Sequence, residues 1–178
     1  ATHEVKPDWS SVTAAPFPLY DPDGIVNPVL SAQNVTDANA VFVADPFLYR
    51  ENGPWYMFFE VLTEDSEENQ KGVIGLATST DGLHWAYDRI VLNEYVHMSY
   101  PHVLKQNGRY YMIPETSSAH ELRVYEAQNF PYDWQHVSTI AQGRPFTDPS
   151  VFFYNNLWWM FVSDTSNANC YLYYSDNL

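Results

Sequence analysis

Three acidic side chains occupy positions from which they could act together in acid–base chemistry. Asp45 and Asp148 each stand immediately before a proline, and Glu115 follows a short apolar run. Two carboxyl groups on either side of a glycosidic bond can supply the acid and the base that cleave it. Burial raises the pKa of a carboxyl group, which suits Glu115 to the role of general acid. The sequence therefore presents these three residues as candidate catalytic groups.

Each of these carboxylates also has a structural interpretation. An Asp before proline commonly accepts a hydrogen bond from the backbone N–H two residues on and caps a turn. That is the more ordinary role for Asp45 or Asp148 taken singly. Glu60 matches Glu115 in the repeat pattern described next, but an acidic stretch that begins at Glu64 follows it directly. We expect Glu60 to matter less than Glu115 for this reason.

Three further side chains could contact a sugar. Tyr100 and His102 flank the proline of the second repeat, and Trp159, beside Trp158, offers a flat ring to a sugar face. The alternatives are core packing for the aromatic residues and a satisfied polar group for His102. The six His residues lack the spacing of a metal site, and no glycine-rich phosphate loop is present, so the sequence predicts neither metal nor cofactor.

The segments that must position these residues repeat three times. When Pro46, Pro101 and Pro149 are aligned, a turn follows each proline by six residues and an aromatic residue follows it by ten. Asn-Gly is the strongest short-range signal for a β-hairpin, because both central residues of a type I′ turn need positive φ. The three turns are Asn52-Gly53, Asn107-Gly108 and Asn155-Asn156. Each repeat is therefore predicted to open with an antiparallel hairpin.

A third and a fourth strand complete the pattern. The repeat is about 50 residues long, which is typical of a four-stranded propeller blade. We predict an all-β propeller in a single domain, with blades over about 44–92, 99–140 and 147–178. In such a fold the starts of the innermost strands gather at one mouth of the central channel, so Asp45, Glu115 and Asp148 are expected to approach each other there.

The ring predicted from these repeats is incomplete. The third repeat stops before a fourth strand, while residues 9–13 resemble an outer strand that has no blade of its own. Three blades are fewer than the four to eight of ordinary propellers. Two explanations stay open, a fragment of a five-bladed ring and a homo-oligomer in which a second copy completes the ring.

The composition of the chain argues against some classes of binding partner. The formal net charge is −14, from 22 acidic and 8 basic residues, which argues against binding to nucleic acid and to anionic membrane surfaces. No apolar run is long enough to span a membrane. A single cysteine excludes a disulfide within the chain and leaves the compartment open.

Longer stretches carry a resemblance to known families. Asn27–Leu30, Phe42–Phe47 and Ser79–Trp85 resemble segments of the five-bladed propeller glycosidases of the arabinanase, xylosidase and invertase clan. A closer similarity, over roughly residues 9–178, is to the propeller region of glucosamine inositolphosphorylceramide transferases and their uncharacterised bacterial relatives. It is carried by Ser99–His102, Ile113–Thr116 and Leu157–Phe161, among other stretches.

The resemblance implies roles for the candidate residues. Asp45 matches the first-blade Asp that acts as base or nucleophile in the glycosidases, and Glu115 and Asp148 are the other candidate carboxylates. The pattern departs from those families at Tyr100, where an Asp that tunes a pKa is expected, and in carrying its Glu on blade two. In the transferases, transfer chemistry is attributed to a separate domain that this chain lacks.

The resulting expectation is a glycosidase-like enzyme that acts on a glycan or glycoconjugate. Asp45 would be base or nucleophile, Glu115 the acid, and Asp148 a residue that holds substrate or tunes a neighbouring pKa. Two alternatives stay open, a carbohydrate-binding propeller without catalysis and an inactive propeller fragment.

Overall fold

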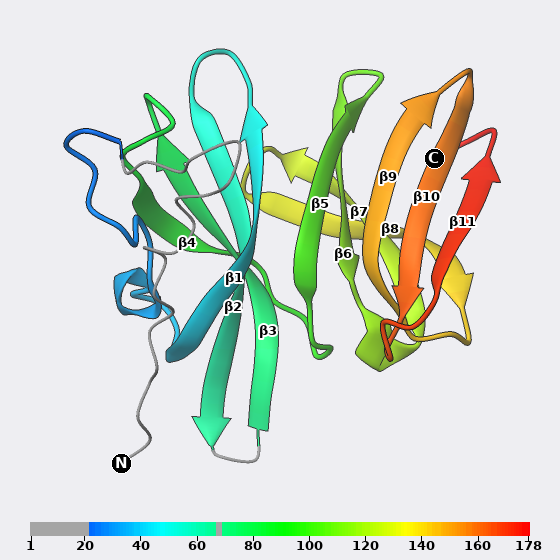
Figure 1. Ribbon diagram of the computed structural model, residues 1–178, viewed down its shortest axis with the longest axis horizontal. Coiled ribbons are helices and arrows are strands. Elements are labelled where there is room, and N and C mark those ends of the chain that lie inside the picture. The colour runs from blue at the N-terminus through cyan, green and yellow to red at the C-terminus, as the bar shows by residue number, and fades with distance from the viewer. Residues whose placement is uncertain (1–21, 67–68) are drawn as a thin grey trace, which may run out of the picture.

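The chain forms β strands joined by short turns. A computed structural model describes residues 22–66 and 69–178 (Figure 1). The predicted strand at residues 9–13 lies outside them. The strands are β1 (Ala40–Arg50), β2 (Trp55–Ser66), β3 (Asn69–Ser79), β4 (Ala86–Leu92), β5 (Ser99–Gln106), β6 (Arg109–Glu115), β7 (Glu121–Asn129), β8 (Asp133–Gln142), β9 (Phe146–Tyr154), β10 (Leu157–Asp164) and β11 (Cys170–Ser175). Two short 3₁₀ helices, η2 (Ala32–Asn34) and η3 (Ser117–Ala119), accompany them. Within the described ranges, no helix has the length and apolar character needed to cross a membrane.

The strands form three antiparallel sheets, which Figure 1 shows side by side. Blade one has the order β1-β2-β3-β4, blade two β5-β6-β7-β8, and blade three β9-β10-β11. The all-β propeller prediction with three blades is confirmed. That the whole chain is a single domain stays a prediction, as does the completion of the ring by further blades or by a second copy.

The predicted hairpin turns are present in all three blades. Asn52 and Gly53 have φ values of 51° and 108°, and Asn107 and Gly108 have values of 50° and 80°. Asn155 and its neighbour Asn156 also have positive φ. Asn and Gly tolerate this region best, which explains why the turns stand at these residues.

Apolar side chains fill the spaces between neighbouring blades. Between blades one and two, Phe58, Leu76 and Met112 are fully buried. The ring of Trp134 packs edge-on against Phe58, and the ring of Phe130 packs against it at a tilted angle. Each such side chain contributes about 1.5–3 kcal/mol when it leaves water. A second layer joins blades two and three through Ile113, Val124, Val151, Trp158, Leu122, Phe146 and Val162. The blades are therefore held in fixed positions relative to one another.

The outer face of blade three is apolar and exposed. Phe152, Phe161, Leu172 and Tyr174 are 43%, 41%, 50% and 70% exposed. They come from adjacent strands and share one side of the sheet, because Phe161 pairs with Leu172. In the part of the chain that the structure describes, β11 has no fourth strand beside it.

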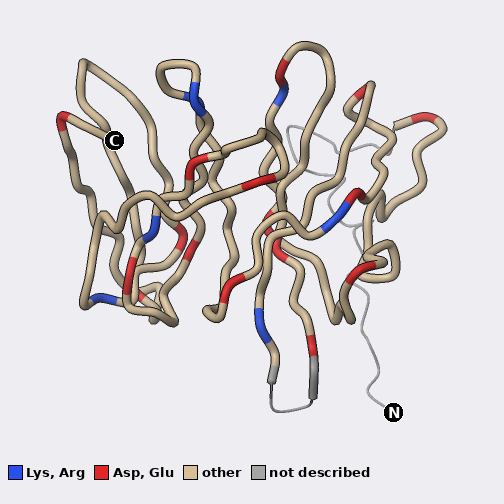
Figure 2. Tube along the Cα trace, turned by 180° about the vertical axis from the view of Figure 1, so that it is seen from behind, with Lys and Arg blue, Asp and Glu red and all other residues tan. Residues whose placement is uncertain are grey.

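Acidic residues are distributed over all three sheets, and some lie near the centre of the molecule (Figure 2). The candidate catalytic residues Asp45, Glu115 and Asp148 lie on β1, β6 and β9. Their surroundings decide whether they act together.

Candidate active site

The residue before each aligned proline has the same unusual backbone. Asp45, Tyr100 and Asp148 have φ values of 51°, 48° and 53°. Each lies where the pairing between the first two strands of its blade is interrupted by a register shift. A left-handed conformation costs about 1–2 kcal/mol outside glycine, and such irregularities re-aim a side chain. The repeat thus gives two aspartates and one tyrosine the same unusual backbone conformation.

The turn-capping interpretation of the two Asp residues has no support from the hydrogen bonds. In the described structure, no hydrogen bond joins the carboxylate of Asp45 to the N–H of Phe47, or that of Asp148 to the N–H of Ser150. The positive φ is therefore not explained by a local cap, and the two carboxylates are free of that structural task.

Glu115 and Asp148 interact across the boundary between blades two and three. Oε2 of Glu115 accepts a hydrogen bond from the backbone N–H of Asp148 at 3.3 Å, and its Oε1 accepts one from the hydroxyl of Ser117 at 2.7 Å. Burial is the main reason that the pKa of Glu115 is raised, and the nearby charge of Asp148 raises it further. The hydrogen bonds that Glu115 accepts from Ser117 and from the backbone of Asp148 act the other way and lower its pKa. The pKa of Asp148 is raised as well, so the two groups are coupled and titrate as a pair.

Asp148 is also coupled to blade one. Its pKa is raised, first by burial and then by the charge of Asp45. A like charge makes ionisation of a carboxyl group harder, so the protonation of Asp148 depends on the charge of Asp45. The three predicted carboxylates therefore belong to one electrostatic unit.

Glu60 is a fourth member of this unit, which sequence reasoning had set aside. The residue is 6% exposed, and burial, Asp45 and Glu115 together raise its pKa to about 7. Its Oε1 lies 3.3 Å from Nε2 of His97. The available signal was its place in the same repeat position as Glu115. We call Asp45, Glu60, Glu115 and Asp148 the inner-strand carboxylates, because each lies on the first or the second strand of its blade.

The inner-strand carboxylates do not form a metal-binding arrangement. Across residues 22–66 and 69–178, no three or more side chains of His, Cys, Asp or Glu are grouped so that they could hold an ion. What the arrangement can do is hold protons and exchange them between neighbouring acids.

Tyr100 and His102 connect the blades next to these carboxylates. The Tyr100 hydroxyl lies 2.9 Å from Oγ of Ser150, and its ring packs edge-on against Phe47 at 4.7 Å. Nε2 of His102 lies 2.9 Å from the carbonyl oxygen of Val151, so Nε2 carries the proton and donates it. Nδ1 of His102 is buried with no hydrogen-bond partner in the described structure. Both side chains have structural contacts, and their role in sugar binding stays a prediction.

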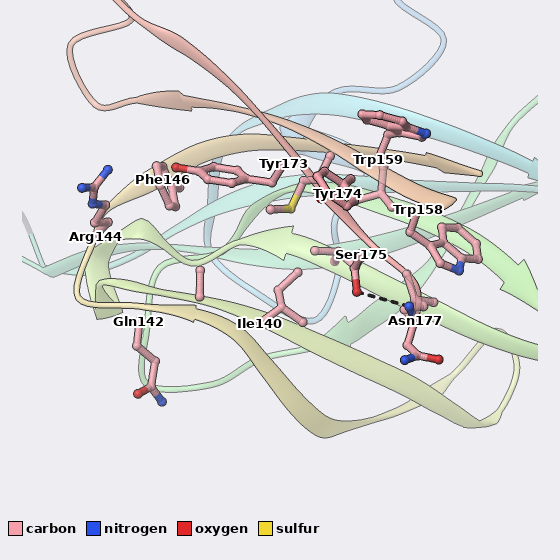
Figure 3. Close-up of a pocket in the computed structure, with 15 residues that line it drawn as sticks. Ile140, Gln142, Arg144, Phe146, Trp158, Trp159, Tyr173, Tyr174, Ser175 and Asn177 are labelled. Atoms are coloured by element: carbon pink, nitrogen blue, oxygen red, sulfur yellow. Dashed lines mark hydrogen bonds between the residues drawn. The ribbon is translucent and has the colours of Figure 1, made fainter. Parts of the chain in front are cut away.

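Trp159 lies in a different place. It borders a hollow of about 530 Å³ between β8 and the strands of blade three (Figure 3). Trp159 pairs with Tyr174 on the outer side of the sheet, whereas Trp158 and Tyr173 line the hollow from the side that faces blade two. Nε1 of Trp159 donates a hydrogen bond to the carbonyl oxygen of Tyr154 at 3.0 Å. None of the inner-strand carboxylates lines this hollow. The structure thus does not bring Trp159 together with the candidate catalytic residues, and its role in sugar binding stays a prediction.

Comparison with protein families gives one match over nearly the whole chain. The model described as glucosamine inositolphosphorylceramide transferase 1, N-terminal, matches residues 15–176. The glucosamine inositolphosphorylceramide transferase 1 of Oryza sativa subsp. japonica is 37% identical over 162 residues, which are 86% of this chain and 21% of that protein. Its namesake from Arabidopsis thaliana is 35% identical over 143 residues, 79% of this chain and 18% of that protein. The chain spans about a fifth of the length of these relatives.

Solved structures with a similar fold are glycoside hydrolases. An exo-β-1,3-galactanase from Clostridium thermocellum superposes with a TM-score of 0.69 at 16% identity, over 84% of this chain and 36% of the galactanase. A glycosyl hydrolase from Bacteroides ovatus gives a TM-score of 0.68 at 16% identity, over 88% of this chain and 55% of the hydrolase. Identities this low support the fold alone.

Proposed function

The chain belongs to the family of the N-terminal region of glucosamine inositolphosphorylceramide transferase 1, and from this premise we propose that its propeller acts on the sugar of a glycoconjugate by carboxylate acid–base chemistry. Relatives of the chain are named as transferases, while proteins of the same fold are named as hydrolases. Both act where a sugar is joined to another group. The substrate class proposed here is accordingly a glycoconjugate of the kind in the relatives' name, a glucosamine-bearing inositolphosphorylceramide.

The observation that carries the proposal is the coupling of Glu115 and Asp148 across two blades. Burial and the neighbouring acid raise the pKa of Glu115, which is the direction that suits a general acid, and the hydrogen bond that it accepts from the backbone of Asp148 holds it in place. The acid would give its proton to the departing oxygen as the bond from that oxygen to the anomeric carbon breaks. In the same step Asp45 would take the proton of the water or hydroxyl whose oxygen forms the new bond to the anomeric carbon. If Asp45 instead forms that bond itself, water or a hydroxyl deprotonated by Glu115 would displace it in a second step.

A second candidate function is sugar binding without catalysis. One observation favours it, namely that both carboxyl oxygens of Glu115 already accept hydrogen bonds, from Ser117 and from the backbone of Asp148. Both hydrogen bonds favour the ionised carboxylate and fix its orientation, which suits a group that holds a sugar rather than one that donates a proton. In a longer transferase, such a module would hold the glycoconjugate for chemistry done elsewhere.

A turnover assay separates the two functions. The protein is incubated with chromogenic aryl glycosides and with glucosamine-bearing inositolphosphorylceramide, and free sugar or transferred sugar is quantified. Catalysis at the inner-strand carboxylates predicts a rate that Glu115→Gln and Asp45→Asn abolish and that Asp133→Asn, at an exposed position on β8, leaves unchanged. Binding to these substrates with no product from any variant would favour the second function.

A further inference from the structure

Glu60 lies in a space that the neighbouring backbone leaves open for it. Its side chain is 7% exposed and projects from β2 toward blade two, beside Gly72 of β3. A Cβ atom at Gly72 would stand 2.8 Å from Oε1 of Glu60 and 2.4 Å from the carbonyl oxygen of Met98. The lack of a side chain at this one position therefore makes room for the carboxyl group and for the segment that leads into blade two.

His97 is fixed beside this carboxyl group in a defined protonation pattern. The backbone N–H of Gly72 donates a hydrogen bond to Nδ1 of His97 at 2.9 Å, so Nδ1 carries no proton. A neutral ring then has its proton on Nε2, the atom that lies 3.3 Å from Oε1 of Glu60. Burial lowers the pKa of His97 and outweighs the charge of Asp45, which acts to raise it, so the net shift favours the neutral ring. The N–H of Nε2 therefore lies on the side of the ring next to Oε1 of Glu60, at a contact distance of 3.3 Å and without a hydrogen bond between the two in the described structure.

We propose that Glu60 is a second proton-carrying acid of the sugar site and that His97 is the residue that positions it. The inference rests on the proposed function, because it assigns these residues to the same site. While Glu60 holds its proton, it adds no charge beside Asp45 and Glu115. Once Glu60 ionises, repulsion makes Glu115 hold its own proton more tightly. The ionisation of Glu60 in blade one thus changes the pKa of Glu115 in blade two.

The charged groups around the pair are consistent with this role. Glu60 faces Asp45 of β1, Glu115 of β6 and His97 from the connection between β4 and β5. On its other side, His97 borders a hollow of about 450 Å³ that gives it access to solvent. Lys71 and Arg123 also line that hollow, but within the described residues neither cation is paired with Glu60. The ammonium group of Lys71 binds Asn93 and the carbonyl oxygen of Glu94, and the guanidinium group of Arg123 binds Glu94 and Glu121.

Carboxyl ¹³C and imidazole ¹⁵N NMR titrations test the pair without any sugar. In the unchanged protein, Nδ1 of His97 should show the resonance of an unprotonated nitrogen and Nε2 that of a protonated one. His97→Asn keeps an acceptor for the N–H of Gly72 but is too short to reach Glu60. It should raise the titration midpoint of Glu60 by about 0.5–1 pH unit, because the ionised carboxyl loses the polar N–H that lies beside it. His120→Asn, at an exposed histidine, is the matched control and should leave the midpoint unchanged.

A second variant checks the coupling to blade two. Glu60→Gln should lower the titration midpoint of Glu115, since a repelling charge is removed. Three results would each overturn the inference. They are a titration midpoint of Glu60 that His97→Asn leaves unchanged, a protonated Nδ1 of His97 in the unchanged protein, and a titration midpoint of Glu115 that Glu60→Gln leaves unchanged. These titrations do not depend on turnover. If the protein has no activity on any sugar, the proposed function fails, and the NMR titrations still decide whether His97 and Glu60 interact.

Discussion

The backbone N–H of Asp148 donates a hydrogen bond to Oε2 of Glu115 over 3.3 Å, and this bond joins the first strand of blade three to the second strand of blade two. The position of Asp148 follows from its left-handed backbone, which the aligned residues Asp45 and Tyr100 share. A feature of the repeat thus brings together acids that are far apart in sequence, and the site depends on how neighbouring blades meet.

Glu115→Gln tests the acid without disturbing this contact. The amide oxygen of glutamine can accept from the N–H of Asp148, and its NH₂ group can donate to Ser117, so the free energy of unfolding should change by no more than about 1 kcal/mol. Turnover should fall about 10²–10⁴-fold, the usual contribution of a general acid. Urea unfolding and initial rates are the two measurements. Full activity in a folded variant would remove Glu115 from the mechanism.

Glu60 should make the protein less stable as pH rises. Its folded pKa of about 7 lies above the ordinary value of 4.5, so the folded state binds the extra proton between these limits. Stability from this group is complete below about pH 4.5 and is lost as pH rises through about 7, by up to about 3 kcal/mol. The raised pKa values of Glu115 and Asp148 act in the same direction.

Urea unfolding at pH 5 and at pH 8 measures this effect. Glu60→Gln should weaken the pH dependence, and Asp133→Asn should retain it. If the substitution at Glu60 leaves the difference between the two pH values intact, the buried acid is not its source.

Gly72→Ala should be costly for a steric reason. The new Cβ would meet the carbonyl oxygen of Met98 at 2.4 Å, and a backbone atom cannot swing away as a side chain can. Such overpacking typically costs about 1–3 kcal/mol, and the upper end applies here. Carboxyl and imidazole resonances of Glu60 and His97 should shift as well. Gly108→Ala is a useful comparison, because nothing lies within 4 Å of its Cβ and only the positive φ resists it. Equal losses at the two glycines would contradict the steric account.

The apolar outer face of blade three should bind a hydrophobic dye and limit solubility. Leu172→Lys places a charge at the half-exposed centre of this face and should reduce dye fluorescence, with a change in unfolding free energy of about 0.5 kcal/mol or less. Val137→Lys on β8 is the matched control, since Val137 is exposed to a similar degree on another blade. Light scattering on the same samples reports self-association. Dye binding that Leu172→Lys does not reduce would mean that this face is covered in solution.

The sequence was sufficient to predict the strands and their order but only part of the site. Hairpin turns and residues before prolines are local features, so a repeat of them locates each blade. The burial of Glu60 is not local, because it depends on Gly72 of the next strand and on Met98 and His97 of the following connection. Alternation along β10 likewise assigns Trp158 and Trp159 to opposite faces, but it does not tell which face meets blade two.

The central claim is that a sugar is handled at the inner-strand carboxylates and not in the aromatic hollow of blade three. Mapping of backbone amide shifts by NMR, with a glucosamine-bearing glycoside added stepwise, tests this most directly, since both proposed functions share it. Saturable shifts should gather at Asp45, Tyr100, Glu115 and Asp148, and they should weaken in Glu115→Gln. Shifts that gather instead at Ile140, Trp158 and Tyr173 would contradict the account and move the sugar site to the hollow between β8 and β11.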